Sequence, residues 1–276
     1  TGVQTCALPI FYIPKYTPAS PPHGDMNAVR EAAKLLANAA NPVIVADRAA
    51  RTANGVKLLV ELAETLQAKV IDQQGRMNFP KNHHLNTQPG AVSTADVIIG
   101  LELSDFWATV NQYTDNGEHG GIGFNQTRIK PGTKLISISS VDLITKANYQ
   151  DFQRFQSVDV AMAGDAEATL PALIEAVKAA IPNDKKAAIE KRGEEARKAY
   201  QGNEARTRAA AAIAWDASPI STARLCMEIY NVIKDLDWSL VASEGNVSNW
   251  PNRLWPINKH HQWIGRSGGD RKSTRL

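Results

Sequence analysis

Uninterrupted apolar runs alternate with amphipathic segments over the first two thirds of the chain. An apolar run without polar alternation is typical of a strand that is buried on both faces of a sheet. Such strands are expected at residues 42–47, 68–72, 95–103, 133–139 and 158–164. Segments in which apolar residues recur every three or four positions are expected to be helices, at residues 26–40, 56–67 and 166–181.

Polar residues and prolines mark the boundaries of these helices. Asp25 and Asp165 precede two of them and can cap their first turns, Pro42 stops the first helix, and Pro171 should perturb an early turn of the third. Strands and helices that alternate from residue 26 to 181 predict βαβ units. The expected fold class is therefore α/β, with a doubly wound, Rossmann-like parallel sheet.

The composition changes after the last of these elements. Residues 183–208 are charged and weakly apolar, which predicts an exposed helical connector that is broken at Gly193 and Gly202. Five of the six tryptophans then lie in the final quarter of the chain, so a second α/β domain is expected to begin near Ser218.

This second domain is expected to open with Ser218-Pro219 as a helix cap and first-turn proline. A helix over 220–233 and a buried strand over 239–243 should follow, and then the turn SEGNVSNW, which contains no Lys or Arg. One helix and one strand bury too little surface to be stable alone. The second domain is therefore interpreted as incomplete.

Both ends of the chain are interpreted as foreign to it. The first ten residues, TGVQTCALPI, are encoded by codons that resemble a sequencing-library adapter. The reverse complement of those codons translates as DRKSTRL, which is the sequence of residues 270–276. Residues 1–10 and 270–276 are therefore expected to be adapter-derived and not native, with no part in the fold.

Charge and hydropathy exclude two classes of partner. Without the adapter-like ends, the 31 Lys and Arg become 28 and the 28 Asp and Glu become 27, a net charge of +1. No basic field remains that would favour nucleic acid, and no apolar run is long enough for a membrane span. Cys226 is then the single thiol, in an apolar helical pattern typical of core packing. Without a disulfide framework or a signal peptide, a cytoplasmic protein is expected.

Two other features have simple interpretations. The pairs His83-His84 and His260-His261 lack further ligands at metal-binding spacing, so they are expected to be exposed loop histidines. The segment NGEHGGIG, residues 116–123, is rich in glycine but lacks the Lys-Ser/Thr pair of a phosphate loop. It is expected to be an inserted loop.

Three segments together resemble the thiamine-diphosphate-dependent enzymes of the acetolactate synthase and benzoylformate decarboxylase group. They are ANPVIVADRAA, VAMAGDAEATLPALIEAV and SPISTARLCMEIYNVIKDLDWSLVASEGNVSNW, in this order and spacing. The resemblance implies a linker at 11–25, a central domain at 26–182, a charged helical linker at 183–217, and the truncated start of the thiamine-diphosphate-binding domain at 218–269.

In that family the turn after the first strand of the last domain wraps the cofactor's diphosphate. The resemblance therefore implies cofactor contacts from the turn residues Glu244, Gly245, Asn246, Val247 and Ser248, and from the glycine-rich stretch that begins at Gly268 and Gly269. A glycine turn can bring backbone N–H donors close to an anion, and a metal would then supply the positive charge. A plain surface turn is the alternative.

The resemblance implies that the catalytic Glu and the GDG…N motif that ligates Mg²⁺ lie outside this chain. No catalytic residue and no metal ligand is therefore assigned within it. Central domains of acetolactate synthases often bind flavin, but here the opening strand leads into ADRAAR without a glycine turn, and Ser139 and Ser140 stand where relatives have an Asp. These departures argue against FAD.

The expected parent protein is a thiamine-diphosphate- and Mg²⁺-dependent decarboxylase or carboligase that acts on a small-molecule 2-oxo acid, as a lyase or a transferase, in a homodimer or homotetramer. The chain alone should be inactive. Two alternatives stay open: a module that binds FAD, NAD or ADP, and a non-catalytic assembly scaffold.

Overall fold

The computed structural model describes residues 15, 17–73, 76–114, 124–143, 154–241 and 249–264. Their centre is a sheet of five parallel strands in the order β2-β1-β3-β6-β7. The strands are β1 (Pro42–Ala46), β2 (Lys69–Asp72), β3 (Val97–Leu101), β6 (Lys134–Ser139) and β7 (Val160–Ala163). The predicted α/β class and parallel sheet are therefore confirmed, with each strand inside its expected range.

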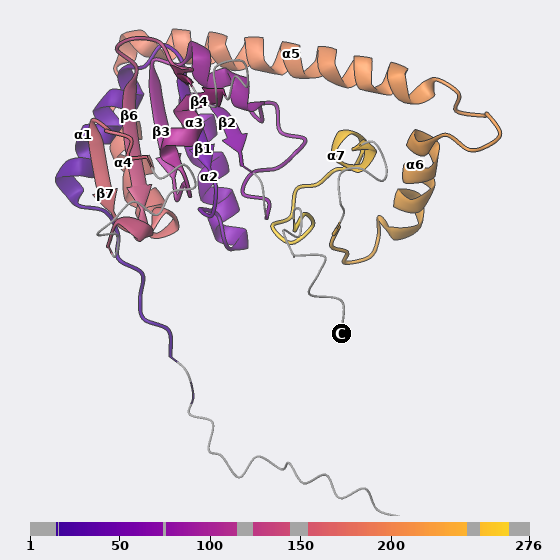
Figure 1. Ribbon diagram of the computed structural model, residues 1–276, viewed down its shortest axis with the longest axis horizontal. Coiled ribbons are helices and arrows are strands. Elements are labelled where there is room, and N and C mark those ends of the chain that lie inside the picture. Colours follow the sequence, from indigo (N-terminus) through magenta and orange to yellow (C-terminus); the bar gives the residue numbers. More distant parts are fainter. Residues whose placement is uncertain are drawn as a thin grey trace, which may run out of the picture.

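Helices cover both faces of the sheet (Figure 1). One face packs against α1 (Met26–Asn38), α2 (Ala53–Leu66) and α4 (Ala166–Ala180). The other face packs against the 3₁₀ segment η1 (Pro89–Thr94) and the short helix α3 (Phe106–Val110). Alternate residues of β1, β2, β3 and β6 point into these two cores, which explains why their sequences lack polar alternation. In the edge strand β7, Val160 and Met162 are buried and Ala161 and Ala163 are exposed.

Two of the expected caps are present. The Asp25 carboxylate accepts hydrogen bonds from Asn27 N and Ala28 N, and the Asp165 carboxylate accepts one from Ala168 N. Helix α4 continues through Pro171, so this proline does not interrupt the helix.

A small antiparallel pair was not predicted. It consists of β4 (Asn111–Thr114) and β5 (Phe124–Thr127). The glycine-rich residues 116–123 lie between these strands and outside the described residues. The hairpin and α3 sit between β3 and β6, where the sequence had indicated only an insertion.

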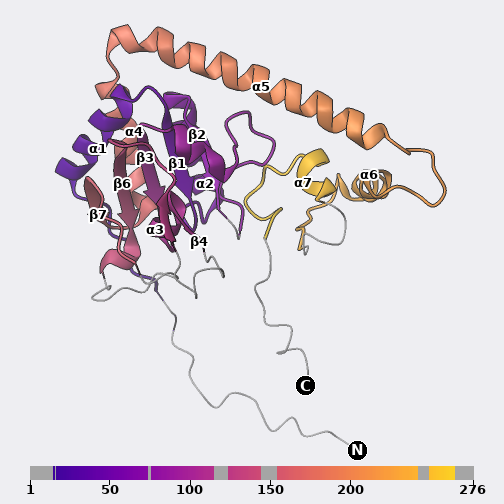
Figure 2. The same ribbon diagram turned by 45° about the horizontal axis from the view of Figure 1, so that its top comes forward.

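The charged connector forms one helix, α5 (Lys186–Ala212), after the short 3₁₀ turn η4 (Asn183–Lys185). The prediction that glycines break it is wrong. At Gly193, α5 lies very close to the end of α2: a Cβ at this position would meet Cδ of the Gln67 side chain at 2.7 Å. Figures 1 and 2 show α5 crossing one end of the sheet and continuing past the β2 edge to α6.

Arg192 fastens α5 to the sheet region. Its guanidinium donates to the carbonyl oxygens of Ala40 at 2.8 Å and Gln67 at 3.1 Å, and also to that of Leu66. Leu66 and Gln67 are at the end of α2, where the last carbonyls of a helix lack internal donors, and Ala40 lies just after the end of α1. Burial lowers the pKa of Arg192, and a nearby Asp96 opposes that shift.

The C-terminal region contains α6 (Thr222–Ile233) and α7 (Trp250–Leu254). The expected cap at Ser218 is wrong: Ser221 accepts the hydrogen bond from Arg224 N at 3.3 Å, because α6 begins three residues later than the proline signal indicated. Within the described residues, the strand expected at 239–243 is reduced to one isolated bridge between Leu240 and Trp263, because no neighbouring strand lies beside it there.

An aromatic cluster holds this region together and joins it to the loop after β2. Trp238 and Trp255 meet edge to face with ring centroids 5.5 Å apart, and Met77 from that loop is buried among them. Met77 N also donates to Trp263 O at 3.0 Å. Cys226 is buried in the same cluster as expected, and burial raises the pKa of its thiol. None of the helices within the described ranges has the length and hydropathy that crossing a membrane requires.

Candidate functional site at the carboxyl edge of the sheet

A cleft of about 720 Å³ opens at the carboxyl ends of β1, β2 and β3. The chain reverses its direction of winding between β1 and β3, and such a switch point is where open α/β sheets bind ligands. The polar lining comprises Asp47, Arg48, Arg51, Asp72, Gln73, Arg76, Asn78 and Ser104. A smaller cavity of about 190 Å³ shares Gln73 and Ser104 with it.

The acidic groups of the lining are engaged by the protein itself. Asp47 follows β1 and accepts Ser104 N at 3.1 Å, which ties the ends of β1 and β3 together. Asp72 ends β2, has a side chain only 1% exposed, and accepts Lys81 Nζ at 2.8 Å. Each of these carboxylates therefore helps to shape the cleft by accepting a hydrogen bond from another part of the chain.

Asn78 connects two loops of the cleft. Its amide nitrogen donates to Asp72 Oδ1 at 3.0 Å, and its Oδ1 accepts the backbone N–H groups of Ala49 at 3.1 Å and Ala50 at 3.0 Å. The loop after β1 is thus held in place by the loop after β2.

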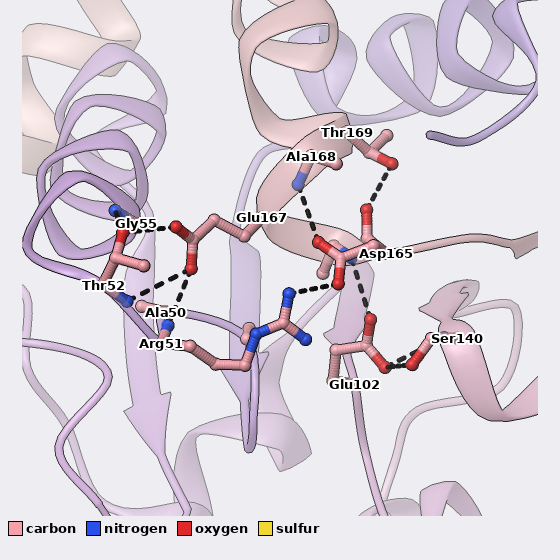
Figure 3. A network of polar contacts seen from close by, with 12 residues as sticks. Ala50, Arg51, Thr52, Gly55, Glu102, Ser140, Asp165, Glu167, Ala168 and Thr169 are labelled. Atoms are coloured by element: carbon pink, nitrogen blue, oxygen red, sulfur yellow. Dashed lines mark hydrogen bonds and ion pairs between the residues drawn. The ribbon is translucent and has the colours of Figure 1, made fainter. Parts of the chain in front are cut away.

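A second polar network, which includes Arg51 of the cleft lining, lies around the first turn of α4 (Figure 3). Glu102 follows β3 with a left-handed backbone, φ 51°, and is buried. Its carboxylate accepts Ser140 N at 2.9 Å, Ser140 Oγ at 2.8 Å and Ala166 N at 2.9 Å. One buried carboxylate therefore joins the ends of β3 and β6 to the first turn of α4.

The same network also binds the backbone and side-chain donors just before α2. Asp165 forms an ion pair with Arg51, and Glu167 accepts Arg51 N at 2.8 Å, Thr52 N at 3.3 Å and the Thr52 hydroxyl (Figure 3). Burial lowers the pKa of Arg51, but the hydrogen bond and charge of Asp165 outweigh this effect and the pKa is raised. The positive charge of Arg51 in the cleft lining is therefore compensated by Asp165.

Arg48 and Arg76 differ from Arg51. Both are exposed in the cleft, and among the described residues neither has an acidic partner within 4.0 Å. Two uncompensated guanidinium groups at one cleft favour an anionic ligand.

The comparisons with known proteins agree with this fold. A sequence model of the family described as "Thiamine pyrophosphate enzyme, central domain" matches residues 29–173, just over half of the chain. The chain belongs to this family.

Relatives and solved structures point the same way. The chain is 27% identical over 168 residues to the acetolactate synthase of Mycobacterium leprae, and 28% identical over 168 residues to that of Mycobacterium bovis. Each alignment covers 60% of this chain and 25% of the relative, so the matched part spans about a quarter of the relatives' length.

Among solved structures, benzoylformate decarboxylase from Polynucleobacter necessarius has a TM-score of 0.56 at 14% identity, over 92% of this chain and 43% of that one. The 4-hydroxybenzoylformate decarboxylase of Rhodococcus jostii has a TM-score of 0.55 at 15% identity, over 91% and 42%. At these identities the likeness concerns the fold alone.

The predicted cofactor residues of this thiamine pyrophosphate family member lie outside the described residues. These are Glu244, Gly245, Asn246, Val247, Ser248, Gly268 and Gly269. Asn249, the first described residue after them, has φ 60°, and α7 starts at Trp250. The expected diphosphate contacts therefore stay a prediction.

All four histidines of the two pairs lie in loops as expected, but they are half-buried, so the expectation that they are exposed is wrong. His83 and His84 stack with ring centroids 4.4 Å apart, and burial together with the neighbouring His83 lowers the pKa of His84. In the second pair, Nε2 of His261 lies 2.7 Å from Oδ1 of Asp237. No group of three metal-ligating side chains occurs in the part of the chain that the structure describes.

The cleft itself was missed by sequence reasoning. Asp47 and Arg48 had been noted only because they replace glycines after the first strand. A usable signal was present: Asp47, Asp72 and Glu102 each occur at the carboxyl end of an apolar run. Only the strand order shows that three of those ends are neighbours, so the sequence by itself did not indicate the site.

Proposed function

We propose that this chain is part of a thiamine-diphosphate- and Mg²⁺-dependent enzyme that decarboxylates or joins 2-oxo acids. The observation that carries the proposal is the match to the central domain of the thiamine pyrophosphate enzymes, on a doubly wound sheet whose chain continues into α5, α6 and α7. The curated relatives are acetolactate synthases, and two structural neighbours are benzoylformate-type decarboxylases. Assembly as a homodimer or homotetramer belongs to this proposal.

The proposed domain limits are those indicated by the sequence: a central domain over 26–182, a linker over 183–217 and part of the diphosphate-binding domain over 218–269. Residues 244–248 would hold the diphosphate by backbone N–H groups, with Asn246 and Ser248 adding side-chain donors. When bound, thiamine diphosphate supplies an electron sink for loss of CO₂, while the chain's own residues orient it.

The test uses the complete gene product. It should consume pyruvate or benzoylformate only when thiamine diphosphate and Mg²⁺ are present. Asn246→Ala should weaken thiamine diphosphate binding by about tenfold, because a hydrogen bond to a charged phosphate is lost. The 276-residue chain by itself should show no turnover. Turnover that does not depend on thiamine diphosphate would exclude the proposal.

A second candidate function is nucleotide binding in the cleft at the carboxyl edge. The observation that favours it is the pair of uncompensated guanidinium groups of Arg48 and Arg76 at the switch point of the sheet. Titration with ADP, NAD and FAD tests it by calorimetry. ADP should bind to the wild-type chain and lose at least tenfold in affinity in the double variant Arg48→Ala/Arg76→Ala.

A further inference from the structure

The loop after β1 is the place where doubly wound folds usually hold a phosphate, because its backbone N–H groups and the following helix N-terminus point at the ligand. In this chain four consecutive N–H groups of that loop already have acceptors. Ala49 and Ala50 donate to Asn78 Oδ1, and Arg51 and Thr52 donate to Glu167 Oε2.

Both acceptors come from elsewhere in the fold. Asn78 lies in the loop after β2, and Glu167 lies in the first turn of α4. Glu167 contributes a negative charge at the start of α2, which the helix dipole favours. Its second oxygen accepts the Thr52 hydroxyl, and that hydroxyl accepts Gly55 N at 3.0 Å.

The Glu167 carboxylate packs directly against Gly55 in the first turn of α2. A Cβ on Gly55 would lie 2.5 Å from Cδ of Glu167, a distance that real side chains do not reach. In phosphate-binding loops a glycine allows close approach of the ligand. Here a glycine allows close approach of the chain's own carboxylate.

We propose that the loop after β1 is self-liganded, with Glu167 and Asn78 in the positions that a ligand's phosphates would take. Glu167 is then a specificity-determining residue, because it excludes a dinucleotide whose pyrophosphate needs those N–H groups. An internal carboxylate competes with any dissolved anion at a high effective concentration. The residues present therefore do not fit a flavin or nicotinamide dinucleotide in the usual position.

This inference deepens the second candidate function, nucleotide binding in the cleft, and rests on it, because Arg48 and Arg76 would bind the ligand in both. With the backbone donors occupied, Arg48 and Arg76 are the uncompensated anion-binding groups that the described lining of the cleft offers. They suit a ligand whose phosphates lie at the open side of the cleft, such as a nucleoside diphosphate. They do not suit a ligand whose pyrophosphate lies at the N-terminus of α2.

The experiment titrates the full chain with inorganic pyrophosphate and with FAD, and follows the backbone amide resonances of residues 49–52. In the wild type, pyrophosphate should leave the Arg51 and Thr52 amides unchanged, and FAD should not bind. Glu167→Ala should bind pyrophosphate at least about tenfold more tightly than the wild type, with both amides shifting, because two donors become free and one negative charge is lost.

Glu167→Gln is the matched control, since it keeps the size and one acceptor oxygen but removes the charge, and its gain should be smaller. Micromolar FAD binding to the wild type with shifts at residues 49–52 would overturn the inference, as would a folded Glu167→Ala that gains nothing. If Glu167→Ala does not fold, the titrations of the wild type decide: shifts of the amides of residues 49–52 on addition of FAD overturn the inference, and unchanged amides support it. Loss of ADP binding in Arg48→Ala/Arg76→Ala tests the nucleotide site separately, since it leaves Glu167 in place.

Discussion

The sheet region and the C-terminal region contain equally clear amphipathic patterns but differ in what covers them. In the sheet region, β1 and β3 are buried at every position and α1, α2 and α4 close one face. In the C-terminal region, α6 places Val232 at 76% exposure, although the helix itself is well formed and capped. A periodic sequence therefore specifies a helix locally, whereas burial depends on the elements that pack against it.

The largest effect on stability is expected from shortening a side chain in the sheet region, compared with the same kind of change in the C-terminal region. Ile99 is fully buried in the central strand β3, so Ile99→Ala should lower the free energy of unfolding by about 3 kcal/mol through lost transfer energy and a cavity. Val232→Ala is the matched control on the exposed face of α6 and should change it by less than about 0.5 kcal/mol. Urea denaturation followed by circular dichroism measures both. Equal losses would mean that the two regions are covered alike.

A smaller effect is expected where α5 joins the sheet region. Arg192→Met keeps much of the side-chain length but leaves the carbonyl ends of α1 and α2 without donors, at a cost of about 2 kcal/mol. Arg192→Lys is the control: it keeps the charge but cannot reach both helix ends at once, and it should recover only part of the loss. The measurement is the urea midpoint. A full recovery by lysine would show that charge alone matters.

The smallest effect concerns pH. Burial first, and then the neighbouring His83 and Arg197, lower the pKa of His84 below its ordinary value of 6.5. The unfolded chain therefore binds a proton more readily, so this stabilising contribution is complete above pH 6.5 and is lost as the pH falls through the lowered pKa. The urea midpoint of the wild type should fall between pH 7 and 5, and that of His84→Gln should fall less. Parallel curves for the two proteins would contradict this assignment.

The strands of the sheet were predictable because burial on both faces leaves a continuous apolar run, and the caps at Asp25 and Asp165 were predictable because a helix start needs a local acceptor. The errors arose where a distant residue decided the outcome. Gly193 does not break α5, and it packs against the Gln67 side chain at the end of α2, a tertiary contact that the local sequence does not show. Ser218 does not cap α6, because the helix starts after Ser221.

The candidate site shows the same division. Sequence resemblance directed attention to residues 244–248, whose cofactor contacts stay a prediction, and it did not indicate the cleft at the carboxyl edge. Arg48 and Arg76 are separated along the chain, and only the pairing of β1 with β2 brings the loops that carry them to one edge. Glu167 was noticed only as part of a helix.

The sequence by itself determined the class of the fold and the order of the five strands of the parallel sheet along the chain, because hydrophobic period and capping are local properties. The resemblance of three segments, and not their periodicity, indicated the family. Tertiary structure alone decided that the N–H groups of the loop after β1 are taken by Asn78 and Glu167, and that Arg48 and Arg76 have no acidic partner among the described residues. The physical reason is that hydrogen-bond satisfaction and charge compensation depend on which distant groups the sheet order brings within about 3 Å.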